Sequence, residues 1–206
     1  MAGTRASKPT VHCDVIADLN VLEELLRVGL NAEWRRVVEA DDRNSVFQSP
    51  DWTVPWYQCY NDLFRPHVLA VRRDRELIGL IPLAVEKVSG RLAFAGDGLA
   101  DYRDVAAVPE DREIVIAELL RHYRAGGFPN MLSMGPMLPE SDSARLAVTL
   151  ARSAGVQTIL RAHEGWRWWR DVPMEDPLKK KSIRQSLKHY EREGQVWVRI
   201  LSGEAE

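Results

Sequence analysis

Cysteine is scarce in this 206-residue sequence, and so are long apolar runs. Cys13 and Cys59 lack the close spacing of a zinc or redox pair, so we expect two thiols, with one disulfide between them as the alternative. No uninterrupted apolar run approaches the roughly 18 residues of a membrane-spanning helix, so no membrane span is expected. Residues 1–10 are small and polar, with no apolar stretch behind them. They predict a disordered N-terminus without a secretory signal and, by default, a cytoplasmic protein.

The common catalytic signatures are missing as well. The sequence contains no G-x-S-x-G nucleophile elbow, no phosphate-binding P-loop and no H-E-x-x-H zinc motif. Gly96-Asp97-Gly98 opens like a dinucleotide-binding fingerprint, but Asp101 stands where the third glycine is required. The five histidines form no i, i+4 pair. We therefore expect no metal site and place each histidine on the surface or in the core.

Charge is nearly balanced over the whole chain, with a formal net charge of −2 and 45% apolar residues. This composition is typical of a globular domain and argues against a nucleic-acid binder. After Leu178 there are seven Lys and Arg against four Glu, so an acidic body precedes a basic end. Lys179, Lys180 and Lys181 open a predicted helix, where cations oppose the helix dipole. They indicate either a solvated face or a phosphate or carboxylate partner.

The apolar periodicity predicts one mixed α/β domain over residues 11–206. Ser49 and Pro50 mark the start of one helix, Gly29 marks a break in the helix before it, and Pro82 marks an edge or a bulge in a strand. The expected helices are 19–40, 50–60, 109–126, 141–154 and 178–193. The expected strands are 11–16, 67–73, 77–88, 91–95, 105–108, 131–134, 156–162, 166–172 and 195–201, with an antiparallel meander from 67 to 95.

A glycine-rich acidic loop carries the clearest candidate chemistry. Asp97, Asp101 and Asp104 surround Tyr102 between two predicted strands. Such a cluster could orient an amine, act as a general base or hold a cation. The alternative is a turn in which the Asp side chains cap backbone N–H groups.

Three of the seven tryptophans lie within residues 166–169. Strand alternation puts Trp166 and Trp168 on one face and Trp169 on the other. The strand is therefore either buried on both sides or lines a groove for a planar or anionic ligand. Trp52 and Trp56 have helical spacing and are expected in the core, with a ligand platform as the alternative.

Four segments in a fixed order carry a family resemblance. They are Phe47-Gln48-Ser49-Pro50-Asp51-Trp52, Ile78-Gly79-Leu80-Ile81-Pro82-Leu83, Leu92-Ala93-Phe94-Ala95-Gly96 running into Asp101-Tyr102-Arg103-Asp104, and Lys181-Ser182-Ile183-Arg184-Gln185-Ser186-Leu187-Lys188 followed by Gly194-Gln195-Val196. Together they resemble the GNAT-superfamily acyltransferases of the CelD (cellulose-biosynthesis) type, relatives of the FemAB-like enzymes. The resemblance covers nearly the whole chain. It implies a GNAT-like α/β fold, with a mixed, largely antiparallel central sheet flanked by helices.

The resemblance implies an N-acyltransferase that moves an acyl group from acetyl-CoA or another acyl-CoA to a small-molecule amine by direct attack. The residues it implies are Asp101, Tyr102 and Asp104 for catalysis, and Trp52, Trp168 and Arg184 for substrate binding. Ala93 stands where the GNAT pyrophosphate loop has Arg or Gln, so no cofactor-binding residue is assigned.

Proteins of this type have two lobes, and the second lobe binds most of the acyl donor. The present chain resembles the N-terminal lobe alone. We therefore expect half of an enzyme, with a missing second lobe or a second copy of the chain as partner. The alternative is a non-catalytic lobe that binds a substrate or a partner protein.

Overall fold

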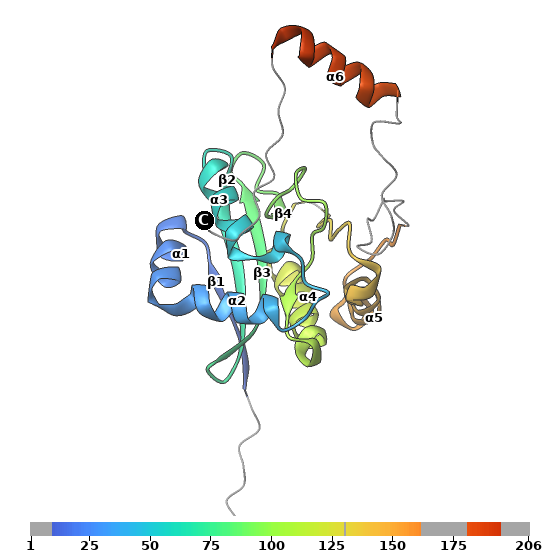
Figure 1. Cartoon of the computed structure of the whole chain (residues 1–206). Helices are drawn as coiled ribbons and strands as arrows, with labels where there is room; N and C mark the ends of the chain where they lie inside the picture. Colours follow the sequence, from blue (N-terminus) through green and yellow to red (C-terminus); the bar gives the residue numbers. More distant parts are fainter. Residues whose placement is uncertain (1–9, 130, 162–180, 195–206) are drawn as a thin grey trace, which may run out of the picture. The chain divides into compact units, whose positions relative to one another are not determined.

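The computed structural model describes residues 10–129, 131–161 and 181–194. The chain divides into two compact units, Met1–His163 and Glu164–Glu206. The first unit is a mixed α/β fold with an antiparallel sheet flanked by helices (Figure 1), which confirms the predicted fold class. The described part of the second unit is the helix α6 (Lys181–Glu193) and the glycine after it.

The sheet has five strands: β1 (Val11–Ile16), β2 (Phe64–Arg73), β3 (Glu76–Glu86), β4 (Leu92–Phe94) and β5 (Ala106–Ala107). Their order is β1-β2-β3-β4, and β5 pairs with β3 beyond the end of β4. All the pairings are antiparallel. The meander predicted between residues 67 and 95 is thus confirmed.

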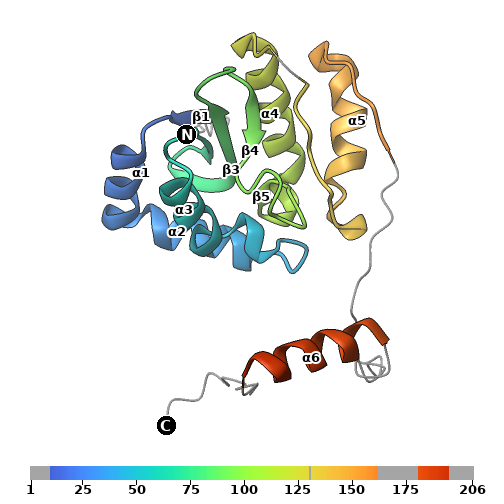
Figure 2. The same cartoon turned by 90° about the horizontal axis from the view of Figure 1, so that it is seen from above.

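Helices cover both faces of this sheet (Figure 2), so its central strand is buried on both sides. Every residue of β3 from Leu77 to Val85 is buried, as its nearly continuous apolar run indicates. Pro82 lies between the part of β3 that pairs with β4 and the part that pairs with β5. Its carbonyl accepts a hydrogen bond from Ala95 N (2.7 Å) on that side. The missing N–H of the proline falls where the neighbouring strand is interrupted, but Pro82 itself lies in the central strand, opposite Val68 of β2, and not at the predicted edge or bulge.

On one face lie α1 (Leu19–Leu25), the π-helical turn η1 (Leu26–Leu30) and α2 (Asn31–Glu39). Asp18 caps α1 by accepting from the N–H groups of Asn20 and Val21. Gly29 has φ 141°, which only glycine adopts readily, and it kinks the helical run where the sequence predicted a break. Trp34 on α2 is fully buried, and its indole N–H donates to the Gln48 carbonyl (2.7 Å).

The same face carries the short helix η2 (Val46–Gln48) and α3 (Pro50–Cys59). Pro50 occupies the first turn of α3, as predicted. Ser49 is the N-cap residue of α3, as predicted, but its side chain makes no capping hydrogen bond to this helix. Ser45 and Gln48 form a reciprocal capping box on η2, whereas the Ser49 hydroxyl donates to the Val46 carbonyl (2.7 Å).

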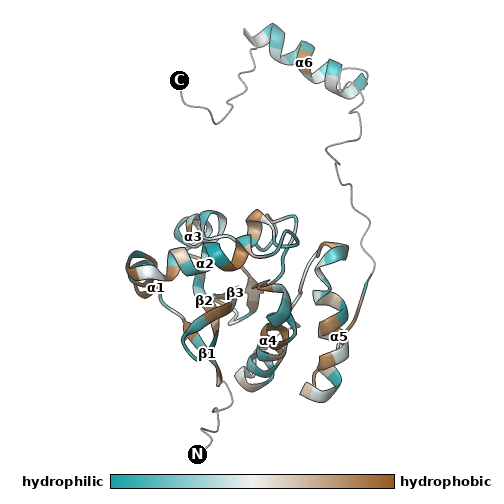
Figure 3. Ribbon diagram, turned by 60° about the horizontal axis from the view of Figure 1, so that its bottom comes forward, coloured by the Kyte–Doolittle hydropathy of each residue, from teal (hydrophilic) through white to brown (hydrophobic). Residues whose placement is uncertain are grey.

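The opposite face is covered by α4 (Arg112–Gly126), which follows the short helix η3 (Pro109–Asp111). A further short helix, η4 (Pro139–Ser141), precedes α5 (Ser143–Ala154), which packs against α4. Gly127 and Gly155 end α4 and α5 in left-handed conformations. In Figure 3, α5 carries apolar residues along its length, whereas α6 is almost entirely hydrophilic.

Two predicted strands do not form. Residues 131–134 and 156–161 have no strand pairing in the described structure. Leu132, Met134 and Val156 instead pack their side chains against the core. The apolar residues of these segments are thus partly packed on the core and partly exposed, without membership of the sheet. The predicted strands at 166–172 and 195–201, and with them Trp168, lie outside the described residues.

None of the described helices combines the length and the apolar character needed to cross a bilayer.

Candidate functional site

The main candidate site is a groove of about 570 Å³ beside α4 and α5, here called the α4–α5 groove. One wall is apolar and comes from the two helices, through Leu119 and Tyr123 of α4 and Ala147 of α5. Opposite these helices lie the two extended segments 131–137 and 156–161. A volume of this size and a mainly apolar lining are typical of small-molecule sites.

The two extended segments leave large apolar side chains exposed at the groove. Met131, Ile159 and Leu160 are 68%, 67% and 69% exposed, and all three line it. Exposed apolar groups of this size gathered around one cavity favour a bound apolar ligand or partner. Covering this apolar surface with a ligand or a partner would therefore lower the free energy of the protein in water.

Arg103 is the part of the acidic loop that reaches the groove. Its backbone N–H donates to the Pro136 carbonyl (2.8 Å), which ties the loop to segment 131–137. Its Nη1 donates to Asp97 Oδ1 (2.5 Å), while Arg91 Nη1 lies 2.8 Å from the other carboxylate oxygen. Arg103 Nε has no hydrogen-bond partner among the described residues. Asp97 thus holds the guanidinium in place at the wall of the groove, where the Arg103 side chain is 15% exposed.

The three predicted catalytic residues do not converge on this groove. Asp101 is exposed, Tyr102 is half-buried and Asp104 is buried at 5% exposure. None of them lines the groove, although all three lie within two positions of Arg103 in the sequence. Sequence reasoning found the loop but placed its chemistry on the acids rather than on this arginine.

Trp52 lies on the other side of the same loop. Phe47 contacts both Trp52 (ring centroids 4.9 Å apart) and Tyr102 (6.3 Å), so the structure brings these two predicted residues to one aromatic cluster. A Cβ on Gly96 would come within 3.0 Å of Trp52 Nε1 and 2.8 Å of the Ala100 side chain. The close approach of loop and indole therefore needs glycine at this position.

Trp56 takes the core position that was expected for it, with only 5% exposure. Its ring packs on Tyr57, Tyr60 and Phe64. Trp52 and Trp56, four positions apart on α3, therefore lie in two different environments.

Of the other two predicted substrate-binding residues, Trp168 lies outside the described residues. Arg184 is exposed on α6, in the second unit of the chain. Neither can be assigned to the groove.

Asp104 belongs to a buried polar cluster centred on Arg112. Its Oδ1 accepts from Val105 N (2.7 Å), and its Oδ2 lies 3.7 Å from Arg112 Nη1. Arg112 Nη2 donates to Asp41 Oδ2 (3.0 Å) and to Asn44 Oδ1 (2.8 Å). Burial raises the pKa of Asp104, because the charged form loses its hydration.

This cluster joins the start of α4 to the 41–44 turn and to α5, since Arg112 Nη1 also donates to Ser143 Oγ (3.1 Å). Arg112 is 2% exposed and Asp41 is 6% exposed. This cluster was not predicted from the sequence. The available signal was Arg112, a cation in the first turn of α4, where the helix dipole disfavours positive charge. A buried, internally paired arginine is best understood as a structural element.

A second unforeseen pair is His67 of β2 and His122 of α4. Their Nε2 atoms lie 2.7 Å apart, so one ring donates to the other. Burial lowers the pKa of His67 to about 4, and the neighbouring His122 and Arg65 add to this. Over the residues that the structure describes, no group of three or more His, Cys, Asp or Glu side chains could hold a metal ion.

The α4–α5 groove, with Arg103 at its wall and the aromatic cluster behind the acidic loop, is the arrangement most suited to a ligand. No family model matches the chain, and no similar curated protein or solved structure was found for it.

Proposed function

We propose that this chain is an acyl-binding lobe of an N-acyltransferase, which takes an acyl group from acyl-CoA for transfer to an amine. The observation that carries the proposal is the α4–α5 groove, which combines about 570 Å³ of mainly apolar space with the guanidinium of Arg103. An acyl chain requires apolar cover, and a CoA thioester carries phosphates that a guanidinium binds well. The family resemblance of the sequence points to the same chemistry.

Transfer would form an amide bond and break the thioester, releasing CoA as the thiol. The amine must first lose a proton to a general base. Asp101 is the accessible carboxylate of the loop, next to Arg103, and is our candidate for this step. Asp104 fits the step less well, because it is buried and paired within the Arg112 cluster.

The direct test is binding of an acyl-CoA series to the full chain by isothermal titration calorimetry, with free CoA as the reference. Affinity is expected to rise from acetyl-CoA to octanoyl-CoA to lauroyl-CoA, because each further methylene is worth up to about 0.8 kcal/mol when buried. Ile159→Asp should weaken lauroyl-CoA binding at least about tenfold. Its control is Val46→Asp, which replaces an equally apolar residue that is 58% exposed on η2 and does not line the groove.

Equal affinity for all three acyl-CoAs, or unchanged binding by Ile159→Asp, would refute the groove as the acyl site. Arg103→Met tests the polar part separately. It should weaken the binding of every thioester and of free CoA by a similar factor, whereas Ile159→Asp acts only on the acylated forms.

A second function is favoured by the placement of the acids. Among the described residues that line the groove there is no carboxylate, and Asp104 is buried. The chain could then be a lobe that binds an apolar ligand without transferring it. Release of free CoA from octanoyl-CoA in the presence of a small amine, followed with a thiol reagent, separates the two functions. Thiol release that Asp101→Asn abolishes supports transfer, whereas binding without thiol release supports the binding lobe.

A further inference from the structure

No described strand pairs with the outer edge of β1. β1 is the terminal strand of the sheet, and within the described parts of the chain it pairs with β2 alone. Asp74 N donates to the Thr10 carbonyl (2.8 Å), and these two residues continue the β1–β2 register. Because antiparallel bonding alternates along a strand, His12 and Asp14 also point their backbone groups toward β2. The N–H and C=O groups of the alternate residues, from Val11 to Val15, therefore point outward.

Asp14 places one charged side chain on this edge strand, but stronger protection is missing from the sequence of β1. Natural edge strands are usually blunted by Lys, Pro or a bulge, and the stretch Val-His-Cys-Asp-Val-Ile has none of these. Val11 and Val15 are 36% and 45% exposed on the strand. An uninterrupted, partly apolar edge of this kind is a template for pairing with another strand.

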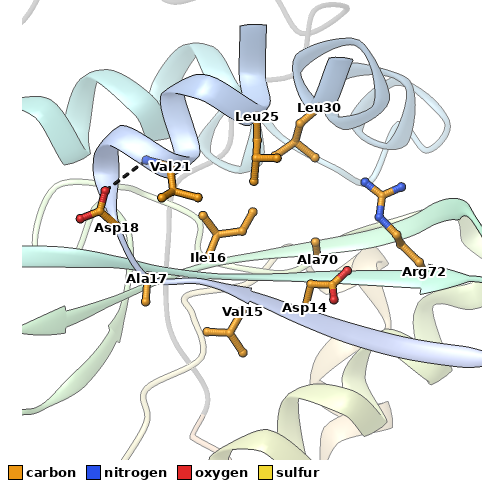
Figure 4. Close-up of a pocket in the computed structure, with 10 residues that line it drawn as sticks. All are labelled: Asp14, Val15, Ile16, Ala17, Asp18, Val21, Leu25, Leu30, Ala70 and Arg72. Carbon is orange, nitrogen blue, oxygen red and sulfur yellow. Dashed lines mark hydrogen bonds between the residues drawn. The ribbon is translucent and has the colours of Figure 1, made fainter. Parts of the chain in front are cut away.

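The neighbouring helix adds further apolar surface at the same edge. Val21 and Leu25 of α1 are 51% and 36% exposed. Both line a cavity of about 580 Å³ between α1 and β1 (Figure 4), in which Val15 points to the opposite side of the strand from Ile16. Apolar groups thus lie on both faces of the sheet beside the open backbone of β1.

We infer that β1 pairs antiparallel with β1 of a second copy of this chain, about a two-fold axis at Cys13. In this register Val11 lies opposite Val15 of the second copy, so all the outward backbone groups of the strand are satisfied. The axis runs normal to the sheet and keeps both α1 helices on the same face. The exposed Val21 and Leu25 of the two copies then approach each other across the seam.

Charge selects this register over its neighbours. Centring the axis on Cys13 places His12 opposite Asp14 of the second copy, where the imidazole can donate to the carboxylate. Centring it on His12 would put two histidines face to face, and centring it on Asp14 would oppose two carboxylates. Like charges directly opposite in a sheet are destabilising. Both side chains are accessible, with 43% and 61% exposure, and within one copy they lie 3.6 Å apart, so pairing across the seam exchanges this contact for one with the second copy.

Sedimentation velocity of the full chain over a range of concentrations tests the interface. The expected result is a dimer that dissociates on dilution, with no larger species, because the two-fold axis closes the assembly. Val15→Lys should raise the dissociation constant of the dimer at least about tenfold. Val88→Lys is the matched control, since Val88 is 93% exposed in the turn after β3, and it should leave the dimer unchanged.

The register is tested by a charge exchange. His12→Asp should produce monomer by opposing two carboxylates, and Asp14→His alone should weaken the dimer in the same way. The double variant His12→Asp/Asp14→His restores opposite partners and should restore the dimer. A monomer at every concentration, a dimer that tolerates Val15→Lys, or a double variant no better than the single ones would overturn the inference. Unchanged circular dichroism spectra of the variants establish that each is folded.

Discussion

Acid should destabilise the fold through the buried histidine pair. The ring of His67 is 8% exposed, lies against Phe128, and has its Nε2 atom 2.7 Å from that of His122. Burial lowers the pKa of His67 from 6.5 to about 4. The unfolded chain therefore takes up a proton at a higher pH than the folded chain does. Stability is full above pH 6.5 and is lost as the pH falls from there toward 4.

The size of the effect follows from the pKa. One pKa unit corresponds to ~1.4 kcal/mol, so the drop from 6.5 to about 4 is worth about 3 kcal/mol of unfolding free energy. Burial also lowers the pKa of His122, so the pair loses stability in the same direction. A singly protonated pair keeps the hydrogen bond, with the charged ring as the donor, whereas protonation of both rings leaves no acceptor and breaks it.

Urea unfolding at pH 7.5, 6, 5 and 4 measures this, with His67→Gln as the comparison. Glutamine keeps hydrogen-bonding capacity but does not titrate, so carboxylates elsewhere contribute equally to both proteins. The free-energy difference between wild type and variant should shrink by about 3 kcal/mol on going from pH 7.5 to 4. A difference that stays constant over this range would refute the reasoning.

Three further substitutions probe the packing of the same unit. Gly79→Ala should destabilise the protein by about 1–3 kcal/mol in urea unfolding, because a Cβ there would lie 2.1 Å from Val115 Cγ2; the double variant Gly79→Ala/Val115→Ala should recover most of the loss. Arg112→Met should cost about 3–5 kcal/mol, since it leaves the buried Asp104 without its cation while Asp41 keeps Arg43, and a loss below about 1 kcal/mol would argue against the buried cluster. Tyr57→Phe should lower the thermal midpoint by removing a buried hydrogen bond to the Leu83 carbonyl (2.6 Å), at a cost of about 1 kcal/mol, and an unchanged midpoint would contradict the bond.

Much of the local structure could be predicted from short-range signals. The break at Gly29 and the helix start at Pro50 follow from backbone preferences that act within a few residues. The apolar run over residues 77–88 predicted a strand, which the structure forms as β3. Ser49 is the N-cap residue of α3, as predicted, but its hydroxyl donates to the Val46 carbonyl instead of accepting from a helix N–H.

The predicted strands at 131–134 and 156–162 failed for a different reason. An apolar run of this length is compatible both with a strand and with an extended segment packed on helices. Only a neighbouring strand distinguishes the two, and the described structure has none beside either segment. These same segments line the α4–α5 groove, so the groove could not be predicted from an apolar periodicity that fits two kinds of structure.

The antiparallel meander, most helix boundaries and the position of the acidic loop could be predicted from the sequence, because they depend on contacts between residues close in the chain. The tertiary structure decided which loop residue meets a cavity. Arg103 lines the groove, whereas Asp104 is buried beside Arg112, whose other partner, Asp41, is 71 positions away. The pairing of His67 with His122, 55 positions apart, and the open edge of β1 are likewise products of topology. The scarcity of cysteine and the missing motifs reduce the number of expected catalytic chemistries. Burial and long-range packing decide the role of each polar group in the acidic loop and in the histidine pair.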